Sequence, residues 1–158
     1  MIYLQVEESL TPEGAPLTID MALLERAAWQ TIQDCAPLPD KDATLVIAGD
    51  EYLQELNRSF LGIDSLTDVL SFADGDVDPD TNRLHLGDVV ISYPRALAQA
   101  TAGGHPVDAE LQLLVVHGTL HLLGFDHTEE QDKIRMWARQ TEILTRLGCP
   151  ITSPVEPA

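Results

Sequence analysis

The amino-acid sequence predicts one globular domain that mixes helices and strands. The chain has 158 residues, of which 44% are apolar, and this is enough for a single hydrophobic core. Four short segments have the pattern of strands, and five have the apolar periodicity of helices. Neither an internal repeat nor a second core is indicated. We therefore predict one metal-dependent hydrolase domain over residues 1–148, followed by a Pro-rich flexible tail over residues 149–158.

The first elements follow from local sequence patterns. Residues 2–7 alternate like a half-buried strand, and Thr18 is a suitable N-cap for the helix that follows. Pro37 and Pro39 interrupt the chain before an apolar, β-branched run at 43–49, which predicts an interior strand. The inward face predicted for the first helix consists of Leu24, Ala27, Ala28, Thr31 and Ile32.

The middle of the chain predicts a helix and two neighbouring strands. Asp50 is expected to cap the helix at its N-terminus. Strands are predicted at 68–72 and 84–91, separated by an acidic loop at 74–82, and so short a connection favours adjacent strands. The residues of the helix that are expected to face inward are Leu53, Leu56 and Phe60.

Two helices are predicted next. Ser92 is expected to begin the first of them, with Pro94 in its opening turn and two glycines at 103–104 to end it. The second begins after Pro106. Its residues 111–123 are apolar on nearly every side, which is typical of a helix buried in a core.

The last predicted helix has start and stop signals of its own. Thr128 and Gln131 match the pattern of a capping box, and Gly148 is expected to end the helix. Apolar residues recur along it every three or four positions, so one face is expected to pack inward. That predicted face consists of Ile134, Trp137, Ala138, Thr141 and Leu144.

Three histidines near the end of the chain predict a metal site. His117 and His121 are one helical turn apart, so their side chains leave the same face of the helix. Gly124 can adopt the left-handed conformation that ends a helix, and the reversal would bring His127 back toward the other two. Three imidazoles leave a fourth position open on a tetrahedral ion, which is the arrangement of catalytic zinc.

Two alternatives for the histidines remain open at this point. They could be core histidines whose ring nitrogens are satisfied by neighbouring carbonyl groups. They could also belong to a closed structural zinc site completed by Cys149 or Cys35, although neither lies in a Cys-x-x-Cys pair. Imidazole sites also accept nickel, copper or iron, so the sequence does not select the metal.

The residues between the histidines distinguish this motif from that of zinc peptidases. A peptidase motif of this spacing has a general-base glutamate directly after the first histidine, and this chain has Gly118 there. The site is therefore expected to be zincin-like in geometry and to act on another substrate. Asp126 is either a residue that orients a ligand or water, or a turn residue that caps its own loop.

Composition bears on partners and on location. The chain has 26 acidic and 9 basic residues, and its net charge of −17 argues by itself against nucleic acid. No segment is long enough to span a bilayer, and the N-terminus lacks the pattern of a secretory signal. Two distant cysteines fit a reducing compartment. We expect a cytoplasmic protein without a membrane segment.

Three ordered motifs resemble one known family. They are Leu56-Asn57 with Thr67 to Phe72, then Leu86 to Ser92, and finally His117 to His127. Together they are similar to the YbeY-type rRNA maturation factors, which are zinc-dependent endoribonucleases. The resemblance implies an α+β fold, a small mixed β-sheet flanked by helices, with a zincin-like metal-binding helix. It also implies one Zn²⁺ per chain and hydrolysis of single-stranded RNA.

The resemblance further implies a biological context and roles for particular residues. The context is maturation of small-subunit rRNA, including 3′ end processing, and ribosome quality control, with rRNA and the small ribosomal subunit as partners. Carried over by position, the metal ligands are His117, His121 and His127. The residues that the resemblance makes candidates for a catalytic or supporting role in the cleft are Asp126, Arg58, Ser71, Asp68 and Asp88.

The chain departs from the family pattern at two positions. Leu61 stands where the family commonly has an arginine, and leucine cannot contact phosphate. Either Arg58, one helical turn earlier, takes this role, or the protein depends less on the contact. Leu66 replaces a proline that is usual in the motif, which bears on the stiffness of the loop more than on the chemistry.

Two other functions remain open from the sequence. One is a ribosome-associated binding factor in which zinc serves stability. The other is a zinc hydrolase for a small or peptide substrate, which the acidic composition fits better than it fits RNA.

Overall fold

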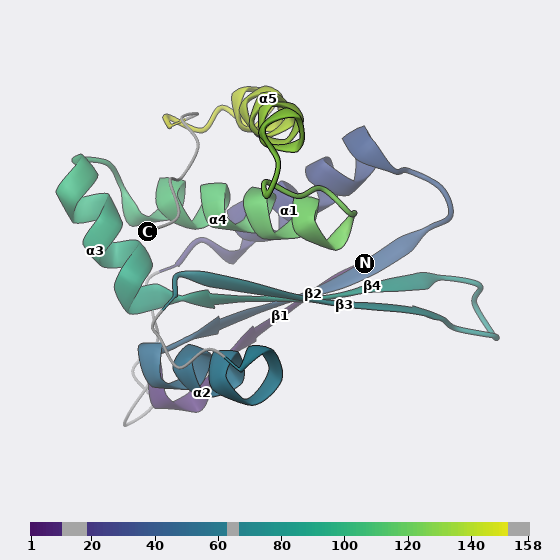
Figure 1. Ribbon diagram of the computed structural model, residues 1–158, viewed down its shortest axis with the longest axis horizontal. Coiled ribbons are helices and arrows are strands. Elements are labelled where there is room, and N and C mark those ends of the chain that lie inside the picture. Colours follow the sequence, from purple (N-terminus) through teal and green to yellow (C-terminus); the bar gives the residue numbers. More distant parts are fainter. Residues whose placement is uncertain (11–18, 63–66, 152–158) are drawn as a thin grey trace.

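The computed structural model describes residues 1–10, 19–62 and 67–151 of the chain (Figure 1). Four strands and five α-helices are present in this part, together with one 3₁₀ turn at Glu8–Leu10. The strands are β1 (Ile2–Val6), β2 (Lys41–Ala48), β3 (Val69–Val77) and β4 (Leu84–Ser92). The helices are α1 (Met21–Cys35), α2 (Asp50–Leu61), α3 (Tyr93–Gly103), α4 (Val107–Leu122) and α5 (Glu130–Arg146).

The four strands form one mixed sheet in the order β1-β2-β4-β3. Strands β1, β2 and β4 are parallel to one another, whereas β3 runs antiparallel to β4. The predicted adjacency of the strands around the acidic segment is therefore confirmed. Because β3 pairs on one side with β4, its other side is an edge of the sheet.

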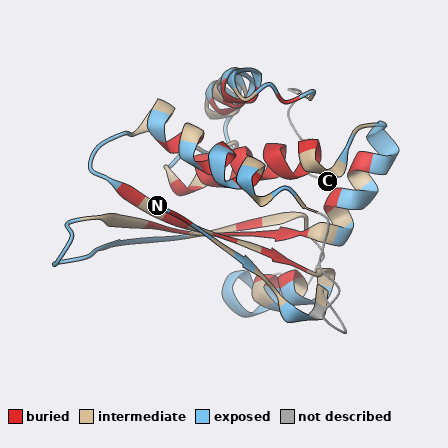
Figure 2. Ribbon diagram, turned by 180° about the vertical axis from the view of Figure 1, so that it is seen from behind, coloured by how far each residue is buried: buried red, intermediate tan, exposed pale blue. Residues whose placement is uncertain are grey.

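The helices cover the two faces of the sheet unequally. Helices α1 and α4 lie against one face, with α5 stacked outside them, and α2 lies on the opposite face (Figure 1). The main core lies between the sheet and α1, α4 and α5, and a smaller cluster, which includes Leu53 of α2, lies on the other face. Figure 2 shows that α4 is buried along nearly its whole length. This is the predicted α+β arrangement of a small mixed sheet flanked by helices.

Several predicted helix ends are confirmed and two are corrected. Ser92 caps α3 by accepting a hydrogen bond from the Arg95 amide, and α4 begins directly after Pro106. The N-cap of α1 is Asp20, whose side chain accepts a hydrogen bond from the Leu23 amide, whereas Thr18 lies outside the described residues. Helix α2 has Gly49 as its N-cap, so the prediction of Asp50 was wrong by one residue.

The strand β3 is longer than predicted. It continues from Val69 to Val77 because Asp74 and Asp76 remain in an exposed hairpin with β4, so the loop is shorter than the predicted 74–82. Polar residues are tolerated there because this end of the hairpin extends beyond the helices (Figure 1) and has no core to face. Phe60, predicted to face inward, is 69% exposed and contacts the ring of Phe72 edge-on.

The inward face predicted for α1 is confirmed, whereas that predicted for α5 is confirmed only at Leu144, which is buried, and at Trp137, which packs against the core. All five residues predicted to face inward from α1 are buried. In α5, Ile134 is exposed and the buried residues are Met136, Gln140, Ile143 and Leu144. Thr128 and Gln131 do not form a capping box, because α5 begins after Glu129. The apolar pattern failed there because the buried face includes a polar residue, Gln140.

The chain packs against the core beyond Gly148. Cys149 is buried, and the side chain of Ile151 contacts the main core. Residues 152–158 lie outside the described residues, as does Leu66. In the part of the chain that the structure describes, none of the helices combines the length and the apolar composition needed to cross a membrane.

Candidate metal centre

Two of the three histidines are positioned by helix α4. This helix is enclosed by the sheet, α1, α3 and α5, so nearly all of its side chains are buried. His117 is only 7% exposed, and His121, one turn later, is partly buried. The two rings meet edge-on with their centroids 4.8 Å apart. An interior helix therefore presents two imidazoles to the same point.

A tight loop after α4 brings the third histidine to the same place. Leu123 ends the helix, and Gly124 has a φ of 97°, a left-handed value that a side chain would make unfavourable. Asp126 then holds the loop, since its carboxylate accepts hydrogen bonds from the His127 amide and the Thr128 hydroxyl. The hydrogen bond from Thr128, followed by that from His127, lowers the pKa of Asp126.

The three imidazoles converge as predicted. The ring of His127 lies with its centroid 5.0 Å from that of His121 and 5.6 Å from that of His117. One ligand nitrogen from each residue lies within 4.8 Å of the other two. In the described part of the chain, this metal-ligand cluster contains no cysteine or carboxylate. Cys149 instead contacts the Ala109 carbonyl, so the structure gives no support to a closed site completed by Cys149.

Each helical histidine has a hydrogen-bond partner of its own. The Nδ1 atom of His117 lies 3.0 Å from the side-chain oxygen of Gln140, which is buried in α5. An amide oxygen can only accept, so Nδ1 carries the proton and Nε2 is left with a free lone pair for a metal. His121 is hydrogen-bonded to the backbone of Phe125. The alternative of two core histidines satisfied only by carbonyl groups does not explain the third ring.

Gln140 is the residue of the site that the sequence prediction missed. It was missed because a lone polar residue on an amphipathic helix is usually predicted to face solvent. The neighbouring Trp137 was predicted to face inward, and its ring lies 5.6 Å from the His117 ring and 5.5 Å from that of His127 between centroids. A polar residue one turn from an inward tryptophan, on the helix that follows the motif, is the signal that could have located Gln140.

Burial favours the neutral form of the two helical imidazoles, His117 and His121. It lowers the pKa of His117 to about 4, with a further contribution from His121, and it also lowers the pKa of His121. A neutral imidazole is the form that binds a metal. The environment therefore favours the ligand form of both residues, and for His117 it does so well below neutral pH.

The histidines line a cavity of about 400 Å³ whose opposite wall is strand β3. Ser71 lies in this wall, and its hydroxyl donates to the Gly118 carbonyl at 2.9 Å, which ties α4 to the strand. Asp68 also lines the cavity, as the resemblance implied, and its carboxylate accepts a hydrogen bond from Gln99. Open space thus remains beside the three rings for a substrate group.

Gly118 explains why a peptidase glutamate is absent. A Cβ atom at this position would lie 2.5 Å from a methyl carbon of Val89 and 3.2 Å from the Ser71 hydroxyl. The position faces the sheet, and the helix packs too closely there for any side chain. The general base of a zinc peptidase could not occupy this place without moving α4 away from the sheet.

Two other candidate residues lie away from the histidines. Asp88 lines a separate cavity of about 500 Å³ on the face of the sheet that carries α2. Arg58 is exposed on α2 and ion-paired with Glu55, and it is not among the described residues that line the cavity of the metal centre. Leu61 is 53% exposed on the same helix.

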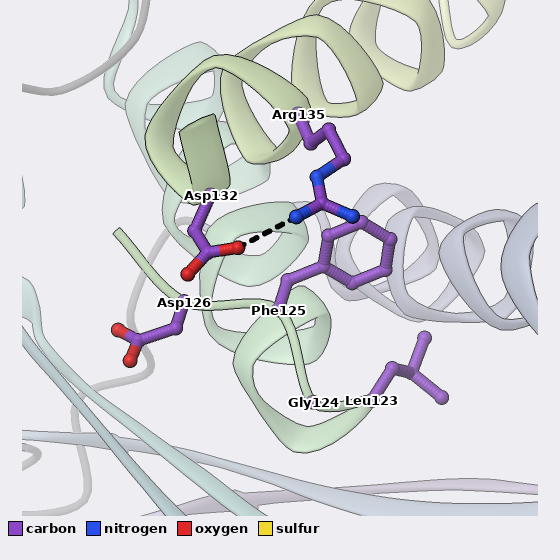
Figure 3. A pocket seen from close by; sticks show the side chains of 6 residues that line it. All are labelled: Leu123, Gly124, Phe125, Asp126, Asp132 and Arg135. Carbon is purple, nitrogen blue, oxygen red and sulfur yellow. Dashed lines mark hydrogen bonds and ion pairs between the residues drawn. The ribbon is translucent and has the colours of Figure 1, made fainter. Parts of the chain in front are cut away.

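A smaller pocket of about 260 Å³ lies beside the loop that carries His127. It is formed by the loop and the start of α5 (Figure 3). Arg135 lies next to the ring of Phe125 there and donates to Asp132 at 2.8 Å. Arg135, the basic residue that lines this pocket, is therefore already paired with an acidic side chain.

The mixed sheet and the buried helix with two converging histidines place this protein among proteins with a zincin-like helix. Comparison with known sequences identifies the particular family. The chain belongs to the YbeY family, because the model of that family, described as Endoribonuclease YbeY, matches residues 18–148. The matched region contains all three histidines and every α-helix of the described chain.

Individual relatives agree with this assignment over most of the chain. A protein named Endoribonuclease YbeY from Roseiflexus sp. (strain RS-1) is 44% identical over 137 residues, covering 82% of this chain and 85% of the relative. One of the same name from Chloroflexus aurantiacus is 45% identical over 142 residues, covering 85% and 91%. One from Desulfitobacterium hafniense is 38% identical and covers 93% and 98%.

A solved structure supports the fold alone. The solution structure of a Thermotoga maritima protein aligns with a TM-score of 0.59 over 93% of this chain and 89% of the other. The two sequences are 24% identical.

Proposed function

We propose that this protein is a zinc-dependent endoribonuclease that cleaves single-stranded RNA. Its proposed role is maturation of small-subunit rRNA at the 3′ end and ribosome quality control, in the cytoplasm and in association with the small ribosomal subunit. Membership of the YbeY family over residues 18–148 is the observation that carries this proposal. The relatives that are 38–45% identical are named endoribonucleases, and this chain keeps three converging histidines beside an open cavity.

The residues of the centre suit a catalytic ion. His117, His121 and His127 would hold Zn²⁺, and the donor set of three imidazoles is that of catalytic zinc sites. Zinc in such a site supplies Lewis acidity, which lowers the pKa of water and stabilises charge on a phosphoryl group. The chain itself positions these ligands: Gln140 orients His117, and Asp126 fixes the loop of His127.

Two of the other candidate residues, Ser71 and Asp126, have structural roles. Ser71 positions the wall of the cavity through its hydrogen bond to Gly118. Asp126 acts as the cap of its own loop, since both of its carboxylate oxygens accept local hydrogen bonds. Arg58 is assigned no step, because its guanidinium pairs with Glu55. A peptide substrate is not favoured, because no carboxylate can follow the first histidine in the packing described at Gly118.

The proposal is tested by metal analysis and RNA cleavage on the same preparations. We expect purified protein to contain one zinc per chain, to cleave a single-stranded RNA, and to lose cleavage on chelation until zinc is restored. His117→Ala and His121→Ala should lose zinc and cleavage together. Cleavage by a metal-free variant would show that the mechanism is wrong. A chelator that lowers the melting temperature of a protein with no RNA cleavage would indicate a binding factor with structural zinc.

A further inference from the structure

Among the described residues, the cavity at the metal centre has no lysine or arginine side chain with which to bind RNA. Asp68 adds an acidic group to its lining. A bound metal would attract the phosphate that is cleaved. The phosphates on either side would face an acidic chain of net charge −17. Among the described residues that line the cavity, neutral hydrogen-bond donors therefore remain as the groups that can hold them.

The side chains of the wall provide few such donors. The Ser71 hydroxyl already donates its hydrogen bond to the Gly118 carbonyl. Val69 and Ala73 have no polar side-chain atoms. The backbone of β3 remains, since residues 67–71 and 73 line the cavity. This strand is the edge of the sheet, and in the described part of the chain no other strand pairs with its outer side.

The register of the sheet shows which amides point outward. The Ser92 amide donates to the Asp68 carbonyl at 2.8 Å, so these two residues form a hydrogen-bonded antiparallel pair. Such pairs alternate with non-hydrogen-bonded pairs along the strand, so Leu70 and Phe72 direct their amides to β4. The residues that direct their N–H groups to the free edge are Val69, Ser71 and Ala73.

We propose that the outward amides of Val69, Ser71 and Ala73 bind the phosphates of single-stranded RNA next to the metal centre. This inference rests on the proposed nuclease function. Alternate residues of an antiparallel strand repeat every ~6.8 Å, a spacing close to that of successive phosphates in an extended nucleic-acid strand. A backbone N–H is a neutral donor, so it binds an anion without adding positive charge to the protein.

The shape of the edge also fits a single strand. An extended chain can follow a straight β-strand for several residues, whereas each backbone of a duplex winds away from it. Ala73 is exposed and lies just before a bulge, where β3 and β4 shift register. The strand edge therefore gives the cavity a selectivity that its side chains do not supply.

A proline substitution tests one of these amides. Ala73→Pro removes the outward N–H and no hydrogen bond to β4, and proline is tolerated on edge strands and at bulges. Losing a hydrogen bond to a charged group should weaken binding about tenfold. We would measure the anisotropy of a labelled single-stranded RNA with phosphorothioate linkages, which resist hydrolysis, on zinc-loaded protein. Ala73→Val is the matched control, because it also enlarges the side chain but keeps the N–H, and it should bind the RNA more tightly than Ala73→Pro.

Unchanged binding by a folded, zinc-loaded Ala73→Pro would overturn the inference. Zinc content and melting temperature show whether the variant is folded. If it is not, the native protein decides the question through backbone NMR. Adding the same RNA should shift the amide protons of Val69, Ser71 and Ala73 downfield and leave those of Leu70 and Phe72, which bond to β4, nearly unchanged.

The NMR outcomes separate this inference from the proposed function. If the native protein cleaves RNA but the alternating shifts are absent, the proposed nuclease function is supported and the edge-strand inference is wrong. If the native protein cleaves no RNA, the proposed nuclease function is wrong. Shifts of the same three amides by an extended peptide, with none by RNA, would show that the edge pairs with a protein strand and would also overturn the inference.

Discussion

The hydrogen bond between His117 and Gln140 sets which nitrogen of a buried ring is available to a metal. The side-chain oxygen of Gln140 accepts from Nδ1 at 3.0 Å, and the α5 backbone fixes its position. Without this acceptor, the ring could take either tautomer and rotate within the site. Partners of this kind around a metal ligand commonly change metal affinity 10–100-fold.

Gln140→Leu should therefore weaken zinc binding by roughly 10–100-fold while leaving the helix intact. The measurement is a competition titration against a chelator of known affinity. Gln140→Glu is the matched control, because it keeps an acceptor at the same distance and should retain tight binding. Equal zinc affinity in the Leu variant and the native protein would show that the hydrogen bond does not position His117.

The lowered pKa of His117 predicts a pH dependence of stability in the metal-free protein. Its pKa is about 4 in the folded chain, mainly because of burial, against 6.5 for the free side chain. Between these values the unfolded chain binds more protons, so the free energy of unfolding falls as the pH drops from 6.5 to 4. The contribution of this one residue is roughly 3 kcal/mol at most.

Urea unfolding of the metal-free protein at several pH values measures this effect. His117→Gln keeps a polar group without the titration, so its stability should change less across the same window. A native protein whose stability is flat from pH 6.5 to pH 4 would contradict the prediction.

At the scale of elements, α4 packs closely against the sheet. The helix approaches β3 and β4 at Gly118, where the nearest atom to an added Cβ would be a methyl carbon of Val89 at 2.5 Å. Ser71 secures the same contact through its hydrogen bond. The position of the helix, and with it both helical histidines, therefore depends on a residue without a side chain.

Gly118→Ala should destabilise the fold by about 1–3 kcal/mol, since overpacking of a core costs this much. The measurement is the midpoint of urea unfolding. Adding Val89→Ala removes the methyl group in the way, so the double variant should be more stable than the sum of the two single effects. Strictly additive effects would show that the two residues do not compete for space.

Elements with a regular pattern could be predicted from the sequence, and those that depend on their neighbours could not. Helix α4 is apolar on nearly every side from residue 111 onward, so its burial could be predicted without knowing what covers it. The inward face of α5 was predicted only in part, because Gln140 is buried against its partner His117, a contact between residues 23 positions apart. The length of β3 was wrong because pairing with β4, not composition, holds its acidic half extended.

At the scale of the whole molecule, the negative net charge of the protein opposes binding of the proposed RNA substrate. With 26 acidic and 9 basic residues, the protein repels a phosphodiester backbone at long range. Most nucleic-acid-binding proteins lose affinity steeply with salt, because cationic side chains displace counterions. Here the cavity has no such side chain among its described residues, so salt chiefly screens repulsion.

Binding of single-stranded RNA should therefore change little, or strengthen, when the salt concentration is raised from about 50 to 200 mM. The measurement is the slope of the logarithm of affinity against that of salt concentration for the zinc-loaded protein. A basic single-strand-binding protein in the same buffers is the control and should weaken. A steep negative slope for this protein would show that basic side chains carry the interaction.

The sequence by itself predicted the three histidines that converge, the buried helix that carries two of them, and the family. These depend on local spacing and on residue identity, both of which are given by the sequence. Only the tertiary structure decided that β3 forms the opposite wall, that Gly118 faces the sheet, that Gln140 orients His117, and that Asp88 lies on the far face. The reason is that these are contacts between segments that are distant in the sequence, and they depend on how the whole chain packs.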